Sequence, residues 1–169
     1  VTSVKQTMDG GYVMTGYVEL ITGGSGDGDI YLVKIDSQGD LLWDKTFDLN
    51  VGGPEKGNSV EQTADGGYIA AGTFPGQTSQ DAFLIKTDAN GNEQWSQTFG
   101  GTETDWGWSV QQTTDGGYII TGYTQSFGNG DYDVYLIKTN SYGDQQWDQT
   151  FGGANNDRAY SVSYTHLRA

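Results

Sequence analysis

The stretch QTTDGGYIITGY at residues 112–123 occurs three times along the chain in slightly different form. It recurs as QTMDGGYVMTGY at residues 6–17 and as QTADGGYIAAGT at residues 62–73. Self-similarity of this kind is typical of repeat architectures, in which each copy is one supersecondary unit. The phrase itself predicts a β-hairpin, because Asp-Gly between apolar alternations favours the positive φ angles of a tight turn. This repeat therefore decides the fold.

Further landmarks keep a constant spacing in the second half of each copy. Lys34, Lys86 and Lys138 are spaced by 52 residues. The aromatic residues that share this spacing are Trp43, Trp95 and Trp147, and Phe47, Phe99 and Phe151. Each copy holds four short runs rich in β-branched and aromatic residues and bounded by turn residues, which predicts four strands. In the third copy these runs cover residues 109–113, 117–124, 133–140 and 144–151.

Each copy is therefore predicted to be a four-stranded antiparallel meander. A meander of about 50 residues cannot bury both faces alone, and stacking the copies around an axis solves this. We expect an all-β protein, a partial β-propeller of about three blades over residues 3–58, 59–108 and 109–160. A β-solenoid and an open sandwich are the alternatives. The regular Lys residues within the third runs predict a structural ion pair or an aromatic contact.

A fourth copy opens at Ser161-Val162 and then departs from the repeat over residues 163–169. An artefact of sequence assembly and a terminal cap are the two interpretations of this departure. Because complete propellers have about four to eight blades, three copies are expected to be incomplete without further blades or self-association. The open faces are expected to expose Val4 on one side and Tyr135 or Ile137 on the other.

Composition excludes several classes of function. The chain has 22 acidic and 8 basic residues, for a formal net charge of −14. Nucleic-acid binding needs a basic surface, and an anionic membrane surface would repel the chain. The sequence has no cysteine, which excludes disulfides and thiolate metal sites. It also has no long apolar run, so we expect no membrane insertion.

The repeat resembles a known family. The segments DVYLIKTNSYGDQQWDQTFGGANND (residues 133–157) and DAFLIKTDANGNEQWSQTFGG (residues 81–101) look like the bacterial and archaeal β-propeller repeats called SBBP repeats. The resemblance covers roughly residues 3–162. It implies a propeller in a large extracellular or surface-attached protein, and it supplies no catalytic residues. Its motifs are built from turn and packing residues, so they specify a fold rather than an activity.

The connections of variable length carry acidic residues, and in a meander they all emerge on one face. The candidate ligands for Ca²⁺, which prefers oxygen atoms, are Asp29, Asp81, Asp133, Glu55, Asp105 and Asp157. Their spacing does not match an EF-hand loop. The competing interpretation, which we favour, is that these carboxylates accept backbone hydrogen bonds in tight loops. No other cofactor is expected.

Trp106 and Trp108 depart from the repeat, which has Lys56 and Asn58 at the same positions. They are candidate ligand-binding residues, because exposed aromatic rings stack on sugars. Packing between blades is the alternative, and we favour it. The sequence shows no credible His base, Cys nucleophile or phosphate-binding loop. We therefore predict no enzyme, but a binding or scaffold module of a secreted or cell-surface protein, with an unidentified protein or glycan ligand. The alternative function is a carbohydrate-binding or carbohydrate-active propeller.

Overall fold

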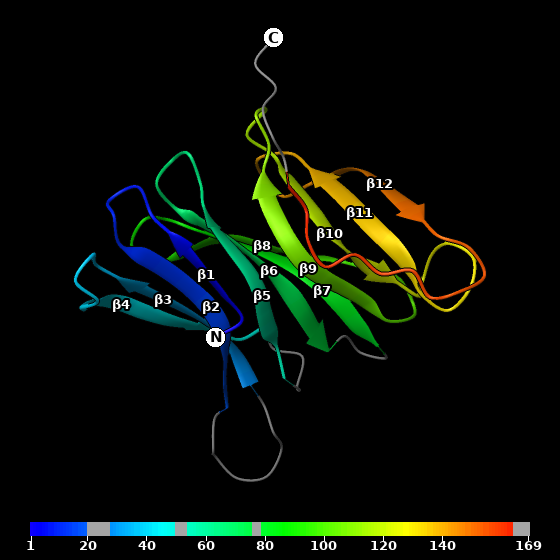
Figure 1. Ribbon diagram of the computed structural model, residues 1–169, viewed down its shortest axis with the longest axis horizontal. Helices are drawn as coiled ribbons and strands as arrows, with labels where there is room; N and C mark the ends of the chain where they lie inside the picture. Colours follow the sequence, from blue (N-terminus) through cyan, green and yellow to red (C-terminus); the bar gives the residue numbers. More distant parts are fainter. Residues whose placement is uncertain (20–27, 50–53, 76–78, 164–169) are drawn as a thin grey trace.

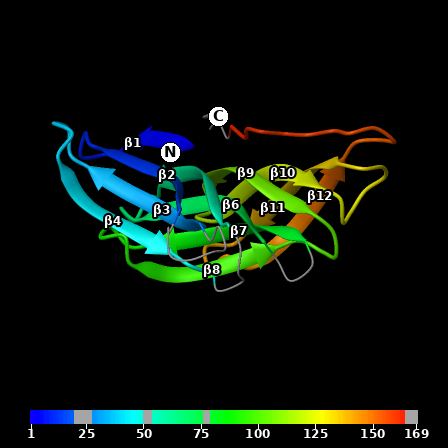
Figure 2. The same cartoon turned by 90° about the horizontal axis from the view of Figure 1, so that it is seen from below.

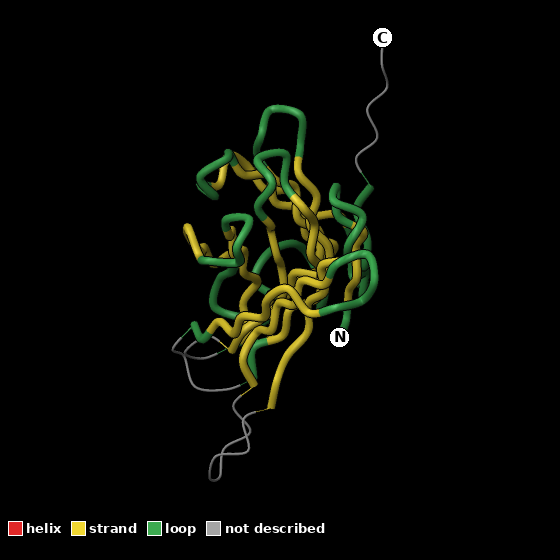
Figure 3. The backbone as a smooth tube through the Cα atoms, turned by 90° about the vertical axis from the view of Figure 1, so that its left-hand side faces the viewer, coloured by secondary structure: helices red, strands yellow, loops and turns green. Residues whose placement is uncertain are grey.

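The protein is built from three antiparallel sheets of four strands each. A computed structural model describes residues 1–19, 28–49, 54–75 and 79–163, and these residues contain strands and no helix (Figure 1; Figure 3). The predicted all-β class and the predicted four-stranded antiparallel repeats are confirmed. None of the described residues forms a helix long and apolar enough to cross a membrane. The sequence analysis interprets residues 163–169 either as an artefact of sequence assembly or as a terminal cap. Residues 164–169 lie outside the described residues, so both interpretations stay open.

Each sheet is a simple meander in which the strands follow one another in chain order. The first sheet contains β1 (Ser3–Gln6), β2 (Tyr12–Glu19), β3 (Gly28–Ile35) and β4 (Leu41–Phe47). The second sheet contains β5 (Lys56–Gln62), β6 (Tyr68–Pro75), β7 (Gln80–Thr87) and β8 (Glu93–Phe99). The third sheet contains β9 (Asp105–Gln112), β10 (Tyr118–Thr124), β11 (Asp133–Thr139) and β12 (Gln145–Phe151).

The three sheets lie side by side, with the second sheet between the other two (Figure 2). The first strands of the second and third sheets pack on the sheet before them, so β5 contacts β2 and β9 contacts β6. One apolar cluster fills the space between the first and second sheets, and another fills the space between the second and third. The second sheet is therefore buried on both faces, whereas each outer sheet is covered on one face by another sheet.

The tryptophan of each sheet reaches the next sheet along the chain. Trp43 meets Tyr68 with ring centroids 5.4 Å apart, and Trp95 meets Tyr118 at 5.8 Å. Both tryptophans are half-buried. Trp147 is 44% exposed. The constant spacing of the three tryptophans predicts that all three are mostly buried at equivalent positions, and this prediction is wrong for Trp147, because no described sheet follows the third one.

The prediction for the open apolar faces is half right. Val4 is exposed at the outer face of the first sheet, as expected. Tyr135 and Ile137 are buried in the cluster between the second and third sheets. Successive strand residues point to opposite faces, so Val134 and Leu136 belong to the outer face of the third sheet instead.

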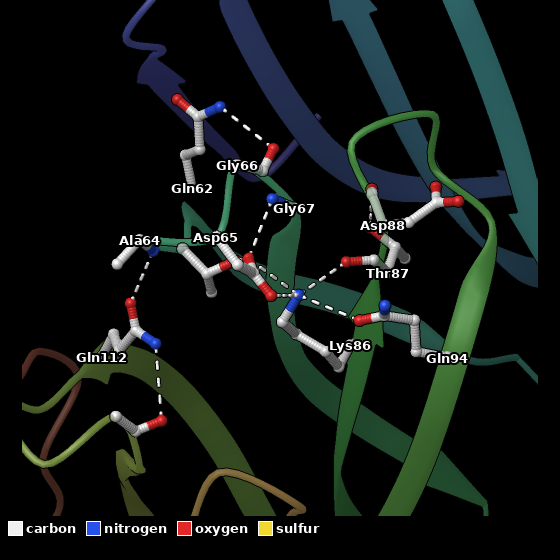
Figure 4. A network of polar contacts seen from close by, with 12 residues as sticks. Gln62, Ala64, Asp65, Gly66, Gly67, Lys86, Thr87, Asp88, Gln94 and Gln112 are labelled. Atoms are coloured by element: carbon white, nitrogen blue, oxygen red, sulfur yellow. Dashed lines mark hydrogen bonds and ion pairs between the residues drawn. The ribbon is translucent and has the colours of Figure 1, made fainter.

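The Asp-Gly-Gly turns are held by their own side chains, and the second repeat is representative (Figure 4). The Asp65 carboxylate accepts hydrogen bonds from the Thr63 hydroxyl at 2.5 Å and from the Gly67 amide at 3.0 Å. Gly66 at the turn has φ 85°, which favours glycine. The Lys86 ammonium lies 3.0 Å from the Asp65 carboxylate and donates to the Thr87 carbonyl at 2.7 Å.

The same ion pair occurs in the other two repeats, between Lys34 and Asp9 at 2.9 Å and between Lys138 and Asp115 at 3.0 Å. The predicted structural ion pair is confirmed. It joins the third strand of each sheet to the turn between the first two strands. A buried ammonium needs hydrogen-bond partners and a counter-charge, and here it has both. The lysines are therefore structural.

Candidate functional site

Carboxylates gather at three places, each where one repeat passes to the next. One carboxylate comes from the start of the third strand and the other from the start of the following unit. We call these places joint 1, which contains Asp29, Asp48 and Glu55; joint 2, which contains Asp81 and Asp105; and joint 3, which contains Asp133 and Asp157. Joints 1 and 2 lie between sheets, and joint 3 lies between the third sheet and the segment that follows it.

Joint 1 holds three carboxylates in close proximity. One oxygen each of Asp29, Asp48 and Glu55 lies within 4.8 Å of the others. Glu55 is only 2% exposed, and its Oε1 has no hydrogen-bond partner among the described residues. Burial raises the pKa of Glu55, and the negative charges of Asp48 and Asp29 raise it further. Asp48 is exposed to solvent, and Asp29 is half-buried.

Joint 2 is built around the fully buried Asp105. Its carboxylate accepts hydrogen bonds from the hydroxyl of Thr124, from the hydroxyl of Ser126 at 2.6 Å and from the Gly101 amide at 2.7 Å. Oδ1 of Asp81 is buried without a partner in the part of the chain that the structure describes. Burial raises the pKa of Asp81, and the charge of Asp105 adds to this.

Joint 3 repeats this arrangement at the end of the third sheet. Asp133 is buried, and its Oδ2 accepts a hydrogen bond from the Asn129 amide at 2.6 Å. Its Oδ1 is without a partner in the described ranges. Asp157 accepts a hydrogen bond from the Gly153 amide at 3.0 Å. Backbone amides thus donate to one oxygen of each carboxylate, as expected if these acids accept backbone hydrogen bonds in tight loops. Among the described residues, Oδ1 of Asp133 has no donor.

A glycine separates the two carboxylates of joints 2 and 3. A Cβ atom added to Gly100 would collide with Oδ1 of Asp81 and approach Oδ2 of Asp105 within 2.7 Å. Gly152 has the same surroundings at joint 3. The corresponding residue of the first repeat is Asp48, which directly follows Phe47 as these glycines follow Phe99 and Phe151. The close approach of the carboxylates therefore explains the glycine, and joint 1 replaces it by a third acid.

Sequence reasoning named six of these seven acids without pairing them. The structure pairs Asp29 with Glu55, and it pairs the acids of joints 2 and 3 in the same way. Asp48 was missed, since it stands where the other repeats have glycine. That departure from the repeat is the signal by which it could have been found. Chemically, such clusters can bind a hard cation or retain a proton.

Trp106 and Trp108 lie together on β9. Their rings stack on each other with centroids 5.4 Å apart, and Trp106 also stacks on Tyr123 of β10 at 5.5 Å. Tyr160 meets the edge of Trp108 at 5.3 Å. Both tryptophans are half-buried. These contacts pack the two tryptophans within the third sheet and against Tyr160 rather than between two described sheets, and ligand binding at this cluster stays a prediction.

Comparison with known proteins gives one weak similarity. The chain is 26% identical over 164 residues to the regulatory protein FlaEY of Caulobacter vibrioides. The match covers 81% of this chain but only 17% of that protein. No family model matches the chain.

Proposed function

We propose that the three sheets are consecutive blades of a β-propeller and that the chain is a non-catalytic scaffold or binding module of a secreted or cell-surface repeat protein. The observation that carries this proposal is the tryptophan–tyrosine contact between successive sheets. The first sheet leaves its tyrosine exposed, and the third sheet leaves its tryptophan exposed. Trp43 and Trp95 are covered by a tyrosine of the next sheet, and Trp147 is not.

The outer face of the third sheet has the residues that such a contact needs. Phe47 and Phe99 are 8% and 6% exposed beneath the neighbouring sheet, whereas the equivalent Phe151 is 55% exposed. A pocket of about 310 Å³ lies beside Trp147 and is lined also by Ile119. At both interfaces between sheets, the equivalent tryptophan is covered by a tyrosine. The pocket is therefore placed to receive the tyrosine of a further repeat.

The outer face of the first sheet offers that tyrosine. Tyr12 is 38% exposed, whereas Tyr68 and Tyr118 at the same position in the later repeats are 2% and 1% exposed. Val4 is likewise exposed and Val60 is buried. The two outer faces are thus complementary, and exposed apolar faces of this kind favour association.

Residues 157–160 already lie along the third sheet as the first strand of a further repeat would. The Asp157 amide donates to the Tyr132 carbonyl at 2.6 Å, as the Glu55 amide donates to the Gly28 carbonyl at 2.7 Å. Arg158 lies over the ring of Tyr123 with its Cζ 5.0 Å from the centroid. Lys56 lies over Tyr17 in the same way at 5.5 Å. This equivalence supports continuation of the propeller after the third sheet.

A scaffold role also accounts for the acidic and basic residues. Lys34, Lys86 and Lys138 are engaged in the turn ion pairs, and the acids of the three joints recur at equivalent positions rather than forming one unique pair. Repetition of this kind is typical of structural positions and offers no single reacting centre. The similarity to a regulatory protein is compatible with a binding role, and it names no ligand.

The test is whether the two outer faces bind each other. The purified chain is expected to associate head to tail, and sedimentation velocity over a range of concentrations measures this. Trp147→Asp removes one face and Tyr12→Asp removes the other, so each variant alone is expected to be a monomer. An equimolar mixture is expected to restore a dimer, because each variant still offers the face that the other lacks.

Phe127→Asp is the matched control, since Phe127 is exposed on the loop between β10 and β11. This variant should associate as the unaltered chain does. A parent chain that is a stable, sharply melting monomer at all concentrations would overturn the closure argument. Association that survives both face substitutions would do the same.

A further inference from the structure

We propose that joint 1 is a Ca²⁺ site formed by the carboxylates of Asp29, Asp48 and Glu55. This inference goes beyond the scaffold role, because it assigns a ligand to one place between the first two sheets. It does not depend on whether the three sheets are part of a closed propeller. It rests on a buried carboxylate oxygen without a partner and on the way in which joint 1 differs from joint 2.

The first observation concerns Glu55. Glu55 is only 2% exposed, and although the backbone amides of Glu55 and Leu49 hydrogen-bond to its carboxylate, Oε1 has no partner within the described ranges. One carboxylate oxygen of Glu55 also belongs to the cluster whose oxygens lie within 4.8 Å of one another. A buried charge is costly unless it is paired or coordinates a metal. The charged groups that act on Glu55 are Asp48 and Asp29, and both are negative.

The second observation is a hydrogen-bond donor of joint 2 that has no counterpart among the described residues of joint 1. Asp105 is the counterpart of Glu55, and its carboxylate is bound by the hydroxyls of Thr124 and Ser126. The residue at the position of Thr124 in the second sheet is Phe74. Phe74 is buried in the apolar cluster and has no proton to donate. Among the described residues, the Thr124 hydroxyl of joint 2 therefore has no counterpart at joint 1.

The third observation is the additional acid. Joint 2 has Gly100 where joint 1 has Asp48. Among the described residues, joint 1 thus has a third carboxylate and no counterpart of the Thr124 hydroxyl, and a cation would offset both differences. Ca²⁺ takes six to eight oxygen ligands at about 2.3–2.6 Å, so two oxygens on opposite sides of one ion lie about 4.8 Å apart. The span of the three carboxylates is compatible with a single ion.

The experiment uses the full chain after treatment with chelator and Ca²⁺ itself as the probe. Isothermal titration is expected to show one site, and about 5 mM Ca²⁺ is expected to raise the melting temperature by mass action. Mg²⁺ at the same concentration should give a smaller rise, because it demands a tight octahedral geometry and dehydrates reluctantly. Equal effects of the two ions would indicate screening of the acidic surface and would overturn the proposal.

Asp48→Asn is the decisive variant, since Asp48 is exposed and its replacement should leave folding intact. It is expected to raise the Ca²⁺ Kd about tenfold or more, because ligand charge determines affinity. Asp81→Asn at joint 2 is the matched control and should leave the Ca²⁺ response unchanged. An unaltered chain that shows neither heat nor a melting shift with Ca²⁺ would refute the site. A response that survives Asp48→Asn and disappears in Asp81→Asn would also refute it.

Discussion

Trp95 of β8 lies against Tyr118 of the following sheet, with the two ring centroids 5.8 Å apart at an interplanar angle of 58°. The pair connects the last strand of one repeat to the first hairpin of the next. Trp43 and Tyr68 form the same contact one repeat earlier, at 5.4 Å. The tryptophan–tyrosine contact between sheets is thus a repeated unit of packing, and its residues can be tested one at a time.

The first prediction compares two tryptophans at equivalent positions. Trp95→Ala is expected to lower the free energy of unfolding by about 3 kcal/mol, at the lower end of the range for tryptophan truncation because Trp95 is half-buried. Trp147→Ala should cost less than about 1 kcal/mol under conditions where the chain is monomeric, since no described sheet covers it. Urea denaturation measures both changes. A loss below about 1 kcal/mol for Trp95→Ala would contradict the packing role.

The second prediction uses two glycines with the same backbone geometry and different surroundings. Gly39 has φ 92° and Gly91 has φ 77°, so alanine is strained at both positions. A Cβ at Gly39 would meet nothing within 4 Å, whereas a Cβ at Gly91 would lie 2.8 Å from the Trp43 ring.

Gly39→Ala should therefore cost only the backbone strain of about 1 kcal/mol. Gly91→Ala should cost more, and it should also change the near-ultraviolet circular dichroism of Trp43. Melting curves and spectra of the two variants, recorded side by side, measure the difference. Equal losses and identical spectra would show that Trp43 does not pack on this turn.

The third prediction concerns pH. Burial raises the pKa of Asp65, but hydrogen bonds from Thr63, Lys86 and the Gly67 amide outweigh this and lower the pKa from 3.8 to about 2. The folded state therefore favours the charged form. Its contribution to stability is complete above about pH 4 and is lost as the pH falls through about 2.

Asp65→Asn removes this contribution. The difference in unfolding free energy between the unaltered chain and the variant should be largest at pH 7, and it should shrink as the pH falls toward 2. Its size at pH 7 is expected to stay below about 1 kcal/mol, because the Asp65 side chain is 59% exposed. Urea denaturation at several pH values measures it. A difference that is constant from pH 7 to pH 2 would argue against a role of the charge.

The fourth prediction distinguishes packing from ligand binding at the aromatic cluster. Trp106→Ala removes two stacked ring contacts, each worth about 0.5–1.5 kcal/mol, so the chain should lose at least about 1 kcal/mol of stability. Chemical denaturation checks this, with Phe127→Ala as a control at an exposed ring outside the cluster. A variant of full stability that loses binding on a glycan array would instead favour the carbohydrate-binding alternative.

Local chemistry explains why much of the fold can be predicted from the sequence. The Asp-Gly-Gly phrase requires a turn because Gly66 and its counterparts take positive φ angles, which depend on neighbouring residues alone. The alternation of apolar residues with a period of two predicts strands for the same reason. The repeat spacing and the six acids were likewise visible without coordinates. By itself, the sequence determined the all-β class, three repeats and the approximate strand positions.

Tertiary structure alone decided which residues meet. Asp29 and Glu55 are brought together because the start of β3 and the start of the second sheet lie next to each other. No local rule predicts the distance between these two carboxylates. Alternation also assigns Tyr135 to a face without saying which neighbour covers it, so this residue was placed on the wrong side. Trp43 and Trp147 occupy the same position in the repeat, and only the presence of a following sheet makes one half-buried and leaves the other exposed. The burial of a side chain depends on what packs against it. A repeated sequence places the same residue at equivalent positions and does not show which of them has a neighbouring sheet.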